Sequence, residues 1–145
     1  MLLANKIVKQ LIPYCKKIQT AGSIRRKEKN PRDIDIVLIP KDRLKLEDCM
    51  EKLGSKVQGG EKESIWKVQG VKVELYYTTG ENWGATLLAY SSRKGAGIGL
   101  RIIARLNGFK LNQYGLWRKG EMVAGRTEEE IYKALGREYK KPENR

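Results

Sequence analysis

The chain has 145 residues, which is enough for one domain or for two small lobes that share a core. Hydrophobic residues make up 40% of it, and no apolar run approaches the length of a membrane span, so we expect a soluble, intracellular protein, cytoplasmic or viral, with no membrane partner. The absence of histidine excludes a Ser-His triad, a histidine general base and a histidine-bearing zinc site. Any chemistry must therefore come from carboxylates, hydroxyls, Lys, Arg or Tyr.

The net charge of +13 is spread over the whole chain. Residues 1–78 contain 17 basic and 10 acidic groups, and residues 79–145 contain 13 and 7. A globular protein this basic is expected to bind a polyanion through phosphate contacts. Charge alone favours nucleic acid only modestly, because a merely soluble basic protein has the same composition.

The first half of the chain is predicted to be rich in strands. Apolar spacing, turn residues and alternation predict a helix over 2–12, a strand over 16–21, a strand over 33–39, a helix from Asp42 to about Leu53, and paired strands over 63–69 and 71–77. In the last of these strands, apolar residues alternate with Lys72, Glu74 and Tyr76.

The second half is predicted to be mainly helical. Its expected elements are helices over 83–91 and about 96–107, a hairpin of 109–112 and 116–124, and a helix that a capping box opens at Thr127 and that ends at Leu135. The polar tail after Gly136 is expected to fray. The pattern predicts an α+β protein with a mixed-sheet lobe at 1–78 and a small helical and β lobe at 79–145.

Three carboxylates are the candidates for chemistry. Asp33 and Asp35 lie two residues apart on a predicted strand, so both side chains are expected on one face. If the strand that carries Glu74 pairs beside them, three anionic groups converge, as in a two-metal site for phosphoryl transfer. Taken singly, a DxD pair or an exposed Glu is as easily explained by a solvated strand.

A glycine-serine step and two arginines precede these carboxylates. Gly22 would let backbone amides approach a phosphate closely, and Ser23 would add a hydroxyl donor. Arg25 and Arg26 could neutralise the charge of a triphosphate. The order Gly-Ser, Arg-Arg, Asp-x-Asp is much more specific than any one of its parts.

The combination of Gly22–Arg26, Asp33–Asp35 and Val73–Leu75 resembles the palm of the family X DNA polymerases. The second half continues this resemblance in Trp83–Ala85, in Gly108–Leu116, which is similar to the thumb signature of the family, and in the stretch from Thr127 to Gly136. The resemblance covers roughly residues 15–142. It implies a nucleotidyltransferase palm at 1–78 and a thumb at 79–145.

The resemblance also implies site residues. Asp33, Asp35 and Glu74 would bind Mg²⁺ (Mn²⁺ in vitro), and Glu74 would help to activate the primer 3′-hydroxyl. Gly22, Ser23 and Arg26 would hold the β- and γ-phosphates of a dNTP.

In the implied thumb, Tyr90 and Lys94 would lie at the nucleotide, and Arg101 would contact the template strand of DNA. The resemblance thus implies a DNA repair polymerase that extends a primer or fills a short gap, and we expect it to be a monomer.

The chain departs from the family pattern in three respects. The helix-hairpin-helix and fingers segments of the family are not matched. The third carboxylate is Glu74 where the family has Asp, which puts the rate in question. Gly97 replaces a side chain that reaches the incoming base, and we expect weak selection of base and sugar. The alternatives are a template-independent terminal transferase and a DNA-binding accessory protein whose catalysis has decayed.

Overall fold

The computed structural model describes all residues from 1 to 145, and they form two compact units, Met1–Thr78 and Thr79–Arg145. Both units combine helices with a β-sheet, so the predicted α+β class is confirmed. No helix is long and apolar enough to cross a bilayer.

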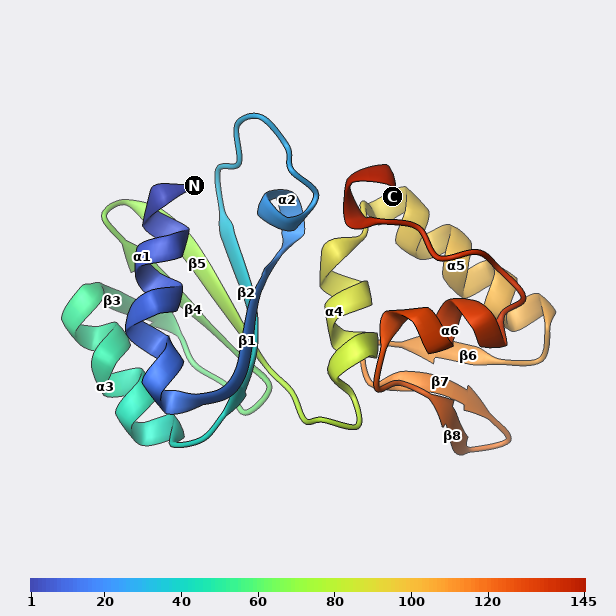
Figure 1. Cartoon of the computed structure of the whole chain (residues 1–145). Helices are drawn as coiled ribbons and strands as arrows, with labels where there is room; N and C mark the ends of the chain where they lie inside the picture. Colours follow the sequence, from blue (N-terminus) through green and yellow to red (C-terminus); the bar gives the residue numbers. More distant parts are fainter. The chain divides into compact units, whose positions relative to one another are not determined.

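The first unit is a five-stranded mixed sheet with two long helices and short helical turns (Figure 1). Its elements are α1 (Leu2–Leu11), η1 (Ile12–Tyr14), β1 (Cys15–Ala21), α2 (Gly22–Arg25), β2 (Ile34–Pro40), α3 (Arg43–Leu53), β3 (Ser55–Gln58), β4 (Glu63–Val68) and β5 (Val71–Tyr77). The strand order is β1-β2-β5-β4-β3, and only the central pair β2–β5 is parallel.

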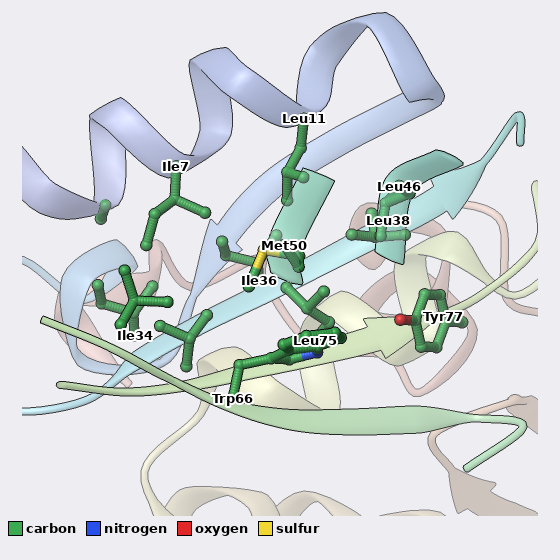
Figure 2. Packing of buried hydrophobic residues seen from close by; sticks show 13 residues of the cluster. Ile7, Leu11, Ile34, Ile36, Leu38, Leu46, Met50, Trp66, Leu75 and Tyr77 are labelled. Carbon is green, nitrogen blue, oxygen red and sulfur yellow. The ribbon is translucent and has the colours of Figure 1, made fainter. Parts of the chain in front are cut away.

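One face of this sheet is covered by α1 and α3, and the core of the unit lies between them (Figure 2). Ile7 and Leu11 of α1 and Leu46 and Met50 of α3 lie in this core with alternate residues of the strands. From β2 these are Ile34, Ile36 and Leu38, and from β5 they are Val73, Leu75 and Tyr77. Because the side-chain period of a strand is two, Asp35 and Glu74 point away from this core.

The second unit contains α4 (Trp83–Ser91), α5 (Lys94–Leu106), β6 (Lys110–Asn112), β7 (Gly115–Arg118), β8 (Glu121–Ala124), α6 (Glu128–Ala134) and η2 (Pro142–Asn144). The three strands form an antiparallel sheet in the order β6-β7-β8. Its core brings together Leu88 of α4, Ala104 of α5, Leu116 of β7 and Ile131 of α6. The N-terminus of α4 packs closely against the chain before α6: a Cβ on Gly84 would lie 2.3 Å from the backbone of Thr127.

Three predictions about the second unit were wrong or incomplete. The strand predicted over 116–124 is two strands, because Lys119 (φ 52°) and Gly120 (φ 79°) make a tight turn between them. Helix α5 begins at Lys94 rather than near residue 96.

The tail does not fray. The side chain of Arg145 is buried against Glu128 of α6, with 2.7 Å between their charged atoms.

In the first unit, strand β3 was not predicted, because all four of its residues are exposed and show no apolar alternation. The strand predicted to begin at Asp33 begins at Ile34. The ladder with β1 ends at the pair Ala21–Asp35 and the ladder with β5 ends at Ile34–Val73, so Asp33 has no partner strand.

Candidate active site

The parallel register of β2 and β5 brings two carboxylates together. Asp35 lies directly opposite Glu74 in this ladder, on the sheet face that α1 and α3 leave uncovered. Both side chains are half-buried. Their proximity depends on a pairing between segments about 40 residues apart, which the sequence analysis could state only as a condition.

Asp33 lies one residue before β2 and is exposed. Its charge raises the pKa of Asp35, so the two carboxylates are electrostatically coupled. No three acidic or cysteine side chains are grouped closely enough to form a complete metal-binding cluster. Asp33 is outside the strand, and the Glu74 carboxylate is already engaged by two neighbours on β5.

Those neighbours are Lys72 and Tyr76, two residues to either side of Glu74 on the same face. Lys72 Nζ lies 2.8 Å from Glu74 Oε1. The Tyr76 hydroxyl donates a hydrogen bond to Glu74 Oε2 and lies 3.2 Å from Asp35 Oδ1. Tyr76 therefore bridges the two strands through their carboxylates, and sequence reasoning missed its role although the alternation placed it beside Glu74.

The electrostatics of this cluster are unequal. Burial, followed by the charges of Glu74 and Asp33, raises the pKa of Asp35 to about 6, against the opposing effects of Tyr76 and Arg26. Burial also acts to raise the pKa of Glu74, but hydrogen bonds from Lys72 and Tyr76 outweigh it and leave that pKa lowered. A half-buried carboxylate with an anionic neighbour is stabilised by a cation, and hard divalent cations prefer carboxylate oxygens.

The glycine of the Gly-Ser step approaches one of these carboxylates. Gly22 has φ +56°, and a Cβ at this position would lie 2.2 Å from Asp35 Oδ2. Glycine is needed here both for the left-handed backbone and for the space. Ser23, the next residue, is the second of the short helix α2 and is half-buried.

Arg26 follows α2 directly. Its guanidinium bonds Glu28 at 2.8 Å, and its charge acts on Asp35. The Nε atom of Arg26 is buried and has no hydrogen-bond partner. Such a donor is costly to leave unpaired, and an anionic ligand beside Asp35 would be one means of satisfying it.

In the second unit, three of the predicted residues line one pocket. Tyr90 from α4 and Lys94 and Arg101 from α5 border a cavity of about 300 Å³, and Gly97 also lines it. Asn112 and Gln113 close the pocket from the β6 side. The sequence analysis identified the first three by resemblance and gave no account of Gln113.

Comparison with known proteins is consistent with this geometry. Residues 87–145 match the family model of the DNA polymerase beta thumb. Over 142 residues the chain is 28% identical to the Repair DNA polymerase X of two isolates of African swine fever virus, covering 90% of this chain and 82% of the viral protein. A third isolate's protein of the same name is 26% identical over 144 residues. The similarity therefore spans both units and includes the β2–β5 carboxylates.

Proposed function

We infer that this chain, which belongs to the family X DNA polymerases, is a repair polymerase that adds a nucleotide to a primer 3′-hydroxyl in DNA. The observation that carries the proposed chemistry is the register pair Asp35–Glu74, with Asp33 beside it. We propose that these three carboxylates hold divalent metal, Mg²⁺ in the cell. A bound divalent cation would supply Lewis-acid stabilisation of the transferring phosphoryl group and of the attacking oxygen.

The residues of this chain would supply position and charge. Asp35 and Glu74 would fix the reacting centre from two adjacent strands of a rigid sheet. Ser23 and the backbone near Gly22 would donate hydrogen bonds to the β- and γ-phosphates, and Arg26 would neutralise them. Tyr90 and Lys94 would lie at the nucleotide and Arg101 at the template strand.

The decisive test uses DNA with a one-nucleotide gap, Mg²⁺ and each dNTP in turn. We expect the templated nucleotide to be added and Asp35→Asn to lower the rate roughly 10³-fold, because electrostatic stabilisation by a held metal is worth several kcal/mol. Asp48→Asn is the matched control, because Asp48 is an exposed carboxylate on α3.

The other outcomes distinguish the alternatives. Equal addition of all four dNTPs would identify a template-independent terminal transferase. DNA binding without addition in Mg²⁺ or Mn²⁺ would identify an accessory protein, and Asp35 would then have no catalytic role.

A further inference from the structure

The small sheet of the second unit has one face on the core and one face toward solvent (Figure 1). Leu111 of β6, Leu116 of β7 and Ala124 of β8 are buried in the core of the unit. Residues that alternate with them point outward. The outward face is therefore not needed to hold the unit together.

A tryptophan lies in the middle of this outward face. Trp117 pairs with Lys110 on β6 and with Met122 on β8. Directly opposed residues share a face of an antiparallel sheet, so the indole is flanked on both sides. Trp117 is only partly buried, whereas Trp66 and Trp83 are 0% and 5% exposed.

The indole ring of Trp117 is held in one orientation. Its Nε1 donates to Asn112 Oδ1 at 3.1 Å. The same oxygen accepts from the backbone N–H groups of Tyr114 at 2.9 Å and Gly115 at 3.1 Å, which fixes the amide. A ring fixed before binding loses little entropy when a ligand stacks on it.

Cations surround a hollow beside this ring. Lys110 and Lys119, both exposed, line an open hollow of about 440 Å³ together with Phe109, Asn112 and Trp117. Neither lysine forms an ion pair. Next to the hollow, the Arg118 guanidinium lies 4.3 Å from the centre of the Phe109 ring.

We propose that this surface, the thumb platform (Lys110, Asn112, Trp117 and Lys119), binds single-stranded DNA. A fixed aromatic face with unpaired lysines on either side provides base stacking and phosphate contacts together, which is how single strands are held without sequence preference. Duplex DNA is a poorer ligand here, because its bases are already stacked and their faces are covered. The proposal goes beyond the polymerase reaction, and it is tested without metal or dNTP.

Tryptophan fluorescence of the full chain tests the proposal. Titration with (dT)₈ is expected to quench the emission, and an eight-base-pair duplex is expected to quench it much less. Trp117→Phe should abolish the quenching, since Trp66 and Trp83 are buried, and Trp117→Ala should weaken (dT)₈ binding at least about fivefold. Quenching that persists in Trp117→Phe overturns the proposal.

A charge variant provides a test that leaves the tryptophan in place. Lys110→Glu with Lys119→Glu should lower the slope of log K against log salt for (dT)₈ by about 1.4, at about 0.7 for each phosphate contact. The matched control is Lys133→Glu with Lys140→Glu, two exposed lysines of the same unit. Equal slopes for the two double variants would overturn the proposal.

Two further substrates identify the source of the strand. Quenching by a duplex with a 5′ template overhang assigns the platform to the template, and quenching by a duplex with a displaced 5′ flap assigns it to the downstream strand. Quenching by neither overturns the proposal.

Discussion

At the scale of single residues, the Tyr76 hydroxyl is the group that joins the carboxylates of β2 and β5. Burial and its hydrogen bond to Glu74 raise the pKa of Tyr76 far above the usual range, so the hydroxyl keeps its proton and remains a donor. It holds the Glu74 carboxylate, one methylene longer than the Asp of the family, toward Asp35.

Tyr76→Phe is expected to lower kcat/KM about tenfold and to raise the Mg²⁺ concentration for half-maximal activity, because a hydrogen bond to a charged group is worth about 1.5–3 kcal/mol. Steady-state rates across a Mg²⁺ titration measure both. Tyr77→Phe is the control, because that hydroxyl bonds Ser64 at 2.8 Å in the core. An unchanged Mg²⁺ requirement in Tyr76→Phe would show that the hydroxyl does not position the carboxylates.

Gly22 makes a second residue-scale prediction. Gly22→Ala would place a methyl group against Asp35 and force a left-handed backbone on alanine, so both activity and stability should fall. Gly70→Ala imposes a similar backbone cost, at φ +77°, with nothing within 4 Å of the added Cβ. We expect both variants to lose about 1–2 kcal/mol of unfolding free energy and only Gly22→Ala to lose most of its activity. Chemical denaturation and gap-filling assays separate the two effects.

At the scale of elements, the start of α6 shows the predicted capping arrangement. Thr127 Oγ1 accepts from the Glu130 N–H at 3.1 Å, and Glu130 Oε1 accepts from the Gly125 and Arg126 N–H groups at 2.8 Å each. These bonds reach back beyond the helix and fasten it to the segment that packs on Gly84. The cap therefore also positions the N-terminus of α4.

This cap predicts a dependence of stability on pH. The backbone N–H group of Gly125, with smaller contributions from Arg126 and Thr127, lowers the pKa of Glu130 below its ordinary 4.5. A lowered pKa means that the ionised carboxylate stabilises the fold above pH 4.5, and that this stabilisation is lost as the pH falls through the folded value.

Glu130→Gln should therefore lower Tm at pH 7, and the difference from the wild type should shrink below pH 4.5. Thermal unfolding at several pH values measures it. Glu129→Gln, which changes an exposed neighbour, should leave Tm nearly unchanged at every pH. A Tm difference that stays constant from pH 7 to pH 3 would contradict the role given to the charge.

The elements also show what local sequence can predict. Alternation located β4 and β5, and the Thr127–Glu130 spacing located α6, because both signals lie within one element. Strand β3 has no such signal, since it is an exposed edge held only by its ladder with β4. The bridge from Tyr76 to Asp35 escaped prediction for a related reason: it depends on the register of two strands distant in sequence.

At the scale of the whole molecule, the charge excess is shared by both units, at 17 basic against 10 acidic groups in residues 1–78 and 13 against 7 in residues 79–145. Neither unit alone accounts for the net charge of +13. A chain of this size that grips DNA with both units is expected to neutralise several phosphates at once, and each releases condensed counterions.

Binding to gapped DNA should accordingly weaken by about 10³-fold or more between 50 and 200 mM KCl, as for about six phosphate contacts, with a slope near −5 in log K against log salt. Fluorescence anisotropy of labelled DNA, measured without metal or dNTP, gives this slope. Reversing charge on either unit alone, by Lys16→Glu with Lys17→Glu or by Arg101→Glu with Arg105→Glu, should reduce the slope in both cases. If only one pair reduced it, DNA would be held by that unit alone, and the shared charge would serve solubility in the other.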